Sequence, residues 1–442
     1  MLTDTILKEI QHQYDITEEN VHSVGYGKKY KNGVDTGEIG IVYSVDKKIP
    51  KEEIPPDQIL PSTLIIDNKN YVTDVVQLPR IKRLASCWNY GLNGGAVDSS
   101  NVLPHRTIQR PLQGGVFITN IAGTYTVNSQ NQGTVGFGTL GLVCVDKDTD
   151  TLVALTNIHV PTPDQFNAVE RTSTNPTHIR NVLETRQIGS SLVQDCVQQF
   201  NETEFSGTTL LADLPGYEIG RIKKYQPMRS TSGIINYIDA LTFTLIASKI
   251  NNSTSFKQLG QNFSSPLPWA TTAELNNLLT SNPYLYSSGR TTGRKGDTCK
   301  LIISQIGVNV GLAYLKQGVE TQLTVSDCFI FRWESTVLRS PIFAGDSGSA
   351  IIATINGQNK VIGLAFAGDQ GKDAQGNSTE GTIGVGCRID RIASILNLEA
   401  WDGTSKNTDQ QSNLSVEYIN GLDADASKII NGKKYWQVGI SA

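Results

Sequence analysis

The stretch PIFAGDSGSAII, residues 341–352, places a serine, a carboxylate and two glycines between apolar runs. Gly, Asp and Ser are the ordinary residues of tight turns, so one interpretation is a turn without chemistry. The other is that Ser347 is a nucleophile whose neighbouring backbone amides converge on a developing oxyanion, a geometry that glycine permits. The second interpretation requires a general base and an orienting acid elsewhere in the chain.

A general base is sought among five histidines: His12, His22, His105, His159 and His178. His159 is distinguished by its context, since it ends the apolar run TLVALTNIHV where a strand gives way to PTPD. A histidine at a strand end can project over a cleft. The alternative is a structural histidine, which is the more common role of such a residue taken alone.

The acid must be buried and held rigidly so that it orients the imidazole. Asp239 fits, because it is a carboxylate inside the apolar β-type run NYIDALTF. A buried carboxylate is costly unless a partner offsets its desolvation. Asp213 and Asp195 are competitors, and both are more easily explained as solvated loop residues. The hypothesis is therefore a nucleophile, base and acid in the order His159, Asp239, Ser347.

The three segments ALTNIHV, YIDALTF and GDSGSAII resemble the His, Asp and Ser segments of the trypsin-like (chymotrypsin-fold) serine peptidases, which share this order. The resemblance covers residues 114–398. It implies two six-stranded antiparallel β-barrels with the active site between them, and an oxyanion hole formed by the amides of Gly345 and Ser347. It also implies that LAFAG, residues 364–368, pairs with the substrate backbone. The substrate-binding candidates are Pro341, Ala365, Phe366 and Ala367.

Within this family the chain looks similar to the intracellular branch that includes the plant narrow-leaf proteins and their bacterial relatives. The stretches that carry this narrower resemblance are NGVDTGEIGIVYSVDKKIP, YVTDVVQ, RPLQGGV, GTLGLV, SSGRTTGRKGD and GLAFAGDQG. The resulting hypothesis is a serine endopeptidase acting through an acyl-enzyme. A regulated variant of it is an enzyme that is latent and cuts one specific cellular protein after a signal, for instance in stress or antiviral defence. The alternative is a catalytically silent, protease-like scaffold or oligomeric interaction protein.

Three departures from the family pattern concern control and specificity. No Ile/Val-Gly-Gly start follows a basic residue, so Asp346 needs a partner other than a new amino terminus. Pro341 is uncharged, which leaves a small or apolar residue before the scissile bond as the default expectation. A long insertion follows His159, and Ser349 stands where secreted digestive enzymes have glycine.

Two further motifs have alternative explanations. SSGRTTGRKGD, residues 287–297, resembles a phosphate loop, but its spacing does not match that of a nucleotide site. DQGKDAQGNSTE, residues 369–380, carries acidic residues at some positions of a calcium loop, but its glycine is misplaced and its flanks are β-type. A hairpin loop is the favoured interpretation there.

The elements that must position these residues are short β-type runs separated by Gly, Asn and Asp, a pattern typical of sandwiches and barrels. Residues 3–14 have the spacing of an amphipathic helix, 266–282 contain the capping-box pair Thr271 and Glu274, and 390–398 predict a closing helix. The expected division is a small α+β amino-terminal unit (1–85), a linker (86–113), a first barrel with His159 and Asp239 (114–262), a helical linker (263–284), a second barrel with Ser347 (285–399) and a tail (400–442), in which residues 434–440 form an edge strand or an intermolecular contact.

Composition excludes several classes of partner. The net charge of −4 and the absence of long Lys/Arg blocks argue against nucleic acid and anionic membranes. Six scattered cysteines without a CxxC pair argue against a metal site and a disulfide framework. The amino terminus lacks the apolar core of a signal peptide, so we expect a cytoplasmic protein. Expected partners are a protein or peptide substrate and no cofactor, with homo-oligomerisation left open.

Overall fold

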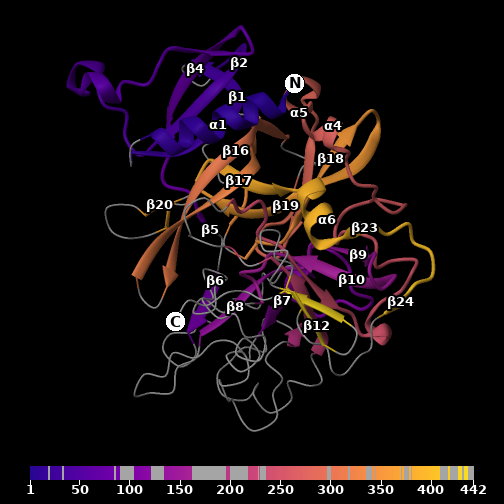
Figure 1. Cartoon of the computed structure of the whole chain (residues 1–442). Helices are drawn as coiled ribbons and strands as arrows, with labels where there is room; N and C mark the ends of the chain where they lie inside the picture. The colour runs from indigo at the N-terminus through magenta and orange to yellow at the C-terminus, as the bar shows by residue number, and fades with distance from the viewer. Residues whose placement is uncertain are drawn as a thin grey trace.

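The computed structural model describes the following residues, to which all structural statements refer: 1–17, 20–31, 34–83, 86–89, 104–120, 134–161, 196–199, 218–226, 228, 235–295, 300–316, 319–334, 341–343, 345–369, 371–372, 378–379, 381–408, 417–418, 427–430 and 433–436. The prediction of a mainly β chain is confirmed, since two large sheets account for most of these residues (Figure 1).

The first sheet has twelve strands. It contains strands of the amino-terminal unit and the strands that precede and follow Ser347. Its pairing order is β15-β14-β18-β19-β22-β17-β16-β1-β2-β4-β3, with β5 attached to β19. The bounds are β1 Val21–Lys31, β2 Val34–Val45, β3 Thr63–Ile66, β4 Lys69–Gln77, β5 Lys82–Arg83, β14 Leu285–Gly289, β15 Gly293–Lys295, β16 Leu301–Lys316, β17 Val319–Trp333, β18 Ala350–Ile355, β19 Gln358–Gly368 and β22 Ile383–Arg388.

Two features of this sheet concern how its strands are joined, and only the second was not expected, since the sequence predicted a six-stranded barrel over residues 285–399. Strand β14 pairs with β16 as well as with β18, so the pairings of β14, β18, β19, β22, β17 and β16 return to their starting strand. Strand β1 pairs with β16 on its other edge, with Ser23 opposite Val310. The amino-terminal unit is therefore a continuation of the sheet that precedes and follows Ser347, as the adjacent indigo and orange strands show (Figure 1).

The second sheet has eleven strands and carries His159 and Asp239 at its strand ends. Its order is β23-β9-β10-β13-β12-β11-β7-β8-β6, with β24 beside β10 and β25 beside β12. The bounds are β6 Ser86–Asn89, β7 Phe117–Asn120, β8 Thr134–Thr139, β9 Leu142–Asp146, β10 Thr151–Thr156, β11 Cys196–Gln198, β12 Glu218–Tyr225, β13 Leu241–Thr244, β23 Leu398–Ala400, β24 Asn407–Thr408 and β25 Glu417–Tyr418. Strand β6 lies inside the stretch expected to be a linker.

Two six-stranded barrels stay a prediction. The pairings of the second sheet do not return to their starting strand within the described ranges. Two hairpins stand apart from the large sheets: β20 Gly371–Lys372 with β21 Ser378–Thr379, and β26 Ser427–Ile430 with β27 Lys433–Trp436. The expected edge strand of the tail corresponds to β27, which pairs with β26.

The helices agree with the predicted positions. Helix α1, Asp4–Ile16, begins after Thr3, whose side chain accepts a hydrogen bond from the Ile6 amide. The short helices α4 Thr272–Leu275 and α5 Leu278–Ser281 lie in the predicted helical linker, and the capping box of Thr271 and Glu274 is present. Short 3₁₀ segments are η1 Lys51–Glu53, η2 Pro56–Gln58, η4 Pro104–Arg106 and η9 Ala247–Lys249. Among the described residues, no helix is long and apolar enough to cross a membrane.

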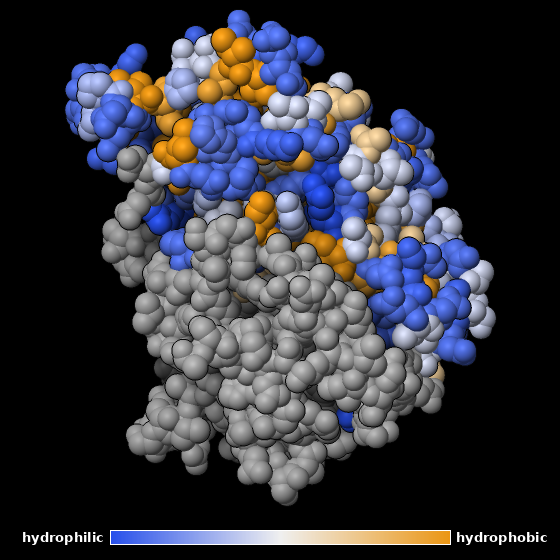
Figure 2. All heavy atoms as spheres, in the orientation of Figure 1, coloured by the Kyte–Doolittle hydropathy of each residue, from blue (hydrophilic) through white to orange (hydrophobic). Residues whose placement is uncertain are grey.

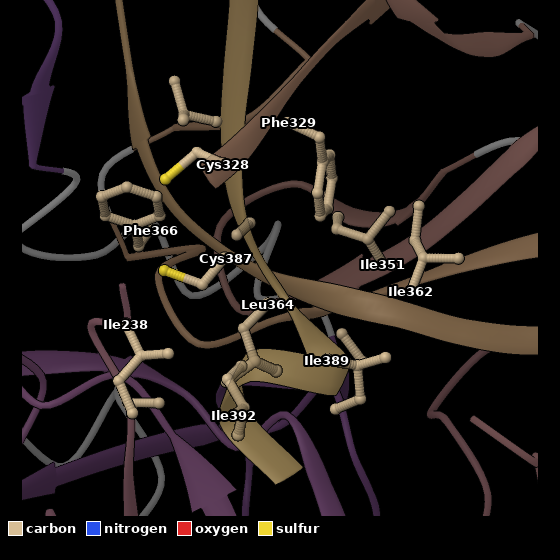
Figure 3. Packing of buried hydrophobic residues seen from close by; sticks show 14 of the residues in the cluster. Ile238, Cys328, Phe329, Ile351, Ile362, Leu364, Phe366, Cys387, Ile389 and Ile392 are labelled. Atoms are coloured by element: carbon tan, nitrogen blue, oxygen red, sulfur yellow. The ribbon is translucent and has the colours of Figure 1, made fainter. Parts of the chain in front are cut away.

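Helix α6, Ile389–Leu396, packs against β19, β22 and β23. Its buried residues Ile389 and Ile392 lie beside Leu364 of β19 (Figure 3). Burial of such side chains is the main stabilising contribution to a fold of this kind. On the face shown in Figure 2, the amino-terminal unit is largely hydrophilic with scattered apolar residues. Ile16 and Ile65 are exposed apolar side chains of this unit.

Candidate active site

His159 lies in the turn that follows β10, and Asp239 lies in the extended residues immediately before β13. The sequence placed Asp239 within a strand, whereas the strand begins two residues later at Leu241. Strands β10 and β13 are antiparallel neighbours with Thr156 opposite Leu241, so the end of one lies beside the start of the other. This register brings the histidine and the carboxylate together.

The carboxylate of Asp239 holds both the ring and the backbone of the histidine turn. His159 Nδ1 donates to Asp239 Oδ2 at 2.5 Å. The amides of Ile158 and His159 donate to Asp239 Oδ1 at 2.9 and 3.4 Å. Three donors therefore compensate the loss of water around a carboxylate that has no exposed surface.

Ser347 lies on the other side of the imidazole. His159 Nε2 and Ser347 Oγ are 2.8 Å apart. Nδ1 keeps its hydrogen and donates it in the hydrogen bond to Asp239. In this tautomer Nε2 carries the lone pair and accepts a hydrogen bond from the serine hydroxyl. The structure thus connects the three predicted residues by two hydrogen bonds, in the arrangement that a base-activated serine requires.

The backbone of Asp239 is fixed as firmly as its side chain. Asn157 Nδ2 donates to the Asp239 carbonyl at 2.5 Å, and the Asp239 amide donates to Cys387 Sγ at 3.3 Å. Cys387 belongs to β22 of the first sheet, and its thiol lies close to Ile238 and Phe366 in the buried cluster (Figure 3). The acid is therefore anchored to both sheets.

The turn that carries Ser347 is held by Thr139 at the end of β8. The Thr139 amide donates to the Ser347 carbonyl at 2.8 Å, and the Thr139 hydroxyl donates to the Gly345 carbonyl at 2.8 Å. Gly345 has φ +95°, a conformation that favours glycine. Within the described part of the chain, the amides of Gly345 and Ser347 have no hydrogen-bond acceptor. They are the two donors expected to form an oxyanion hole.

Asp346, between those two residues, is buried with its carboxylate surrounded by donors. The amides of Thr291 and Thr292 donate to Oδ1 at 2.9 and 3.0 Å. The Thr292 hydroxyl and the Phe343 amide donate to Oδ2 at 2.7 and 3.0 Å. The partners of Asp346 are therefore not an amino terminus. Three of the four donors belong to Thr291 and Thr292 at the turn between β14 and β15, and the fourth is the Phe343 amide.

This turn is the SSGRTTGRKGD motif, whose likeness to a phosphate loop has a physical basis. Its backbone amides do bind an anion, and the anion is the Asp346 carboxylate. A glycine is needed at Gly289, because a Cβ there would lie 2.4 Å from Asp346 Oδ1. The first acidic residue of the motif at residues 369–380, which was compared with a calcium loop, also has protein partners. The Asp369 carboxylate accepts from the amides of Thr382 and Ile383 and from the Thr382 hydroxyl.

We expect the Asp346→Asn variant to lose about 100-fold in the rate at which a fluorophosphonate reacts with Ser347. An amide offers one acceptor oxygen, so its NH2 group faces two of the four donors and displaces the turn between Gly345 and Ser347. The rate of labelling and urea unfolding are measured together. Asp369→Asn is the matched control, because it changes a buried carboxylate bound to backbone amides and is expected to lower stability with little effect on labelling. Equal losses of rate in both variants would contradict a positioning role for Asp346.

A second buried histidine–serine pair has a different geometry. His105 Nε2 and Ser288 Oγ are 2.9 Å apart, but the Ser288 hydroxyl donates to the Leu259 carbonyl at 2.6 Å. Across the described residues, His105 Nδ1 has no hydrogen-bond partner and no carboxylate orients the ring. Burial lowers the pKa of this imidazole. Its context gave no reason to expect catalysis, and the geometry here is that of a structural histidine.

The substrate-binding candidates are all buried. Ala365, Phe366 and Ala367 lie within β19 with no exposed surface, and Pro341 is buried ahead of the Ser347 turn. The edge of β19 expected to pair with a substrate is occupied at Ala367 and Gly368 by β5. The competitors Asp195 and Asp213, and the insertion after residue 161, lie outside the described residues.

Sequence reasoning missed the residues that support the site: Thr139, Asn157, Thr291, Thr292 and Cys387. They share no motif, because each acts through a contact with a residue far away in the chain. The Thr-Thr doublet between glycines was the strongest signal, since exposed backbone amides at a hairpin turn are natural anion binders.

Comparison with known proteins gives the following results. No family model and no curated protein matches the chain. Among solved structures, a glutamic acid-specific serine protease that uses a histidine triad in substrate binding is 11% identical, with TM-score 0.33, and the match covers 66% of this chain and all of that one. The Nocardiopsis protease NAPase is 13% identical, with TM-score 0.33, covering 65% and 98%. Thermobifida fusca protease A is 11% identical, with TM-score 0.31, covering 66% and 98%.

Proposed function

We propose that this chain is a serine endopeptidase with a trypsin-like fold, similar to the intracellular branch of the narrow-leaf proteins. The observation that supports it is the hydrogen-bonded series Asp239, His159, Ser347, with distances of 2.5 and 2.8 Å. The second sheet supplies the base and acid and the first supplies the nucleophile. A pair of barrels, one formed by the closed set of six strands that surrounds the Ser347 region, is part of the same proposal.

The proposed reaction is acyl transfer. His159 Nε2 takes the Ser347 hydroxyl proton while Oγ attacks the carbonyl carbon of the scissile bond. The oxyanion is bound by the amides of Gly345 and Ser347, and His159 then gives the proton to the leaving amine. Asp239 keeps the proton of Nδ1 in place and stabilises the imidazolium. Water hydrolyses the acyl-enzyme by the same route in reverse, and none of these steps requires a cofactor.

The proposed setting is the cytoplasm, with a specific cellular protein as substrate in stress or antiviral defence. One observation favours the second candidate, a silent scaffold: Ser347 has no exposed surface and His159 is only 3% exposed. A covered nucleophile is equally the property of a latent enzyme. The two candidates differ in whether Ser347 is reactive once reached.

The test is covalent labelling of Ser347 by a small alkyl fluorophosphonate over several hours, followed by intact mass measurement. We expect the wild-type chain to gain one phosphonyl group at Ser347 and the Ser347→Ala variant to gain none. Equal labelling of the two proteins would exclude Ser347 as the nucleophile. No labelling of a folded wild-type chain would favour the scaffold.

A further inference from the structure

The residues just before Asp239 are held by the first sheet, although the strand that follows, β13, belongs to the second. Asn236 is buried and forms a parallel bridge with Val325 of β17. Its side-chain Nδ2 donates to the Thr324 carbonyl at 2.9 Å, and its own carbonyl accepts from the Ser326 amide at 2.7 Å. One strand of the first sheet therefore binds both the side chain and the backbone of Asn236.

This contact continues the edge of β17 that β22 occupies. At Val325 the other edge of β17 is paired with Val310 of β16. Strand β22 pairs with β17 at residues 329–332, so Asn236 joins the same edge a few residues farther along. The segment that leads to the acid thus supplies partners for backbone groups of β17 beyond the end of β22.

The two contacts that follow along the chain are also to the first sheet and its helix. The guanidinium of Arg391, in α6, lies 4.9 Å from the centre of the Tyr237 ring. The Asp239 amide donates to Cys387 Sγ of β22 at 3.3 Å. Three Cα–Cα steps span at most about 11 Å, so a displacement of Asn236 acts on the acid over a short piece of backbone.

Strand β17 has a bulge where it binds Asn236. Its residues Ser326 and Asp327 lie opposite the single residue Asn309 of β16. Asp327 has φ +57°, which turns the backbone out of the regular pleat. A bulge of this kind redirects the groups of its strand. The amide that holds the Asn236 carbonyl is therefore placed by the shape of the bulge.

Helix α1 binds this bulge from the amino-terminal unit. Gln11 Oε1 accepts from Asn309 Nδ2 at 2.8 Å and from Ser326 Oγ at 3.3 Å, so one side chain joins the two strands across the bulge. Tyr14, three residues farther along the same helix face, accepts from the Thr324 hydroxyl at 3.4 Å. The two β17 residues whose backbones hold the acid's segment thus have side chains bound by α1, which Figure 1 shows beside β16.

We propose that Asn236 is a positioning residue for Asp239, and that α1 acts on catalysis through it by holding the β17 bulge in place. The proposal rests on the proposed function. The Asp239 carboxylate has to stay within hydrogen-bond distance of His159 Nδ1, and a small displacement of a catalytic group removes much of its effect. The amino-terminal unit thereby has a role in the reaction, although it contributes no residue to the series Asp239, His159, Ser347.

The test measures how fast a fluorophosphonate reacts with Ser347 in the full-length wild-type chain and in its variants, as a function of probe concentration. We expect the maximal rate to fall about tenfold in Asn236→Ala and about threefold in Gln11→Ala, with the half-saturating concentration within about twofold of wild type. The reason is that the acid is displaced while the site that receives the probe is unchanged. Equal maximal rates in wild type and Asn236→Ala overturn the inference.

Gln13→Ala is the matched control for α1. Gln13 is an amide on the same helix and is more deeply buried than Gln11, and its Oε1 accepts from the Tyr43 hydroxyl at 2.7 Å. We expect Gln13→Ala to lower the midpoint of urea unfolding at least as much as Gln11→Ala and to keep the rate within about twofold of wild type. Equal losses of rate in the two variants would mean that α1 acts through stability alone. Should Asn236→Ala fail to fold, this pair decides the inference.

A spectroscopic measurement tests the position of the acid without reference to activity. The Nδ1 proton of His159, bonded to Asp239 Oδ2 at 2.5 Å, gives a low-field proton resonance that the Asp239→Asn variant shifts or removes. We expect this resonance to move upfield in Asn236→Ala, to move less in Gln11→Ala and to stay in place in Gln13→Ala. A resonance that is the same in all four folded proteins, wild type included, contradicts a positioning role.

The double variant Gln11→Ala/Asn236→Ala tests whether the helix acts through Asn236. We expect its loss of rate to be smaller than the product of the two single losses, because both changes weaken the same contact. The full product would mean that α1 acts by another route, which overturns the second half of the proposal.

The same labelling experiment separates the inference from the function on which it rests. A folded wild-type chain that reacts with no probe overturns the proposed function and the inference together. A wild-type chain that is labelled at Ser347, but no faster than Asn236→Ala, overturns the inference alone.

Discussion

The variants Ser347→Ala and His159→Ala are each expected to hydrolyse fluorescently labelled casein about 10⁶-fold more slowly than wild type, and the double variant no more slowly than either. The reason is the direct bond between His159 Nε2 and Ser347 Oγ at 2.8 Å. A serine hydroxyl is a weak nucleophile until a base takes its proton, so loss of the base and loss of the nucleophile remove the same step.

The measurement is kcat, with unfolding monitored in parallel. His105→Ala is the control, because it removes a buried histidine that also contacts a serine hydroxyl, Ser288 Oγ. That variant is expected to change stability and to keep kcat within about tenfold of wild type. Additive losses in the double variant would mean that His159 and Ser347 act in different steps.

Replacing Asp239 by asparagine has the second largest expected effect, a loss of about 10⁴-fold in kcat. An amide in this place presents an NH2 group either to His159 Nδ1 or to the Ile158 amide, both of which now donate to the carboxylate. If the NH2 group faces Nδ1, the imidazole must carry its proton on Nε2 and can no longer accept from Ser347. The imidazolium formed during catalysis also loses the nearby negative charge.

The check is kcat together with the free energy of unfolding, since one or two buried bonds are weakened and each contributes about 1–3 kcal/mol. Cys387→Ala is a graded comparison: it removes the sulfur that accepts from the Asp239 amide and should lower kcat far less. A folded Asp239→Asn variant within tenfold of wild type would return Asp195 and Asp213 to consideration as the orienting acid.

Local context was enough to predict the three residues at the centre of the site. With five histidines in the chain, the search for a base was nearly exhaustive, and a carboxylate in an apolar run is unusual enough to require a partner. The supporting contacts were not predictable in this way. Thr139 and Gly345 are 206 residues apart in sequence, and their bond depends on how two sheets meet.

Which strands join to form each sheet could not be predicted from the sequence either. The prediction of a small α+β unit over residues 1–85 does not say which edge of the larger sheet its strands cover. Strand β16 has sixteen residues, and an edge of this length must be paired or protected. Strand β1 pairs with this edge of β16, and this pairing makes the amino-terminal unit part of the sheet that bears Ser347.

Two adjacent lysines of β12 are both buried, although adjacent residues of a regular strand lie on opposite faces. Lys223 and Lys224 are both buried and both bind Asp146, with Nζ–O distances of 2.7 and 2.5 Å. Successive strand residues normally point to opposite faces. A register shift between Ile222 and Lys224 accompanies this exception, as expected where a bulge locally changes the pleat.

The order of strands also determines how the chain is tethered. The backbone runs from the first sheet to the second between β5 and β6, back to the first between β13 and β14, and again to the second between α6 and β23. Strands β6 to β13 of the sheet that bears His159 and Asp239 are thus inserted between two parts of the sheet that bears Ser347, and β23, β24 and β25 join the second sheet after it. Three covalent crossings therefore join the two sheets, and each of them limits how far the base can move from the nucleophile.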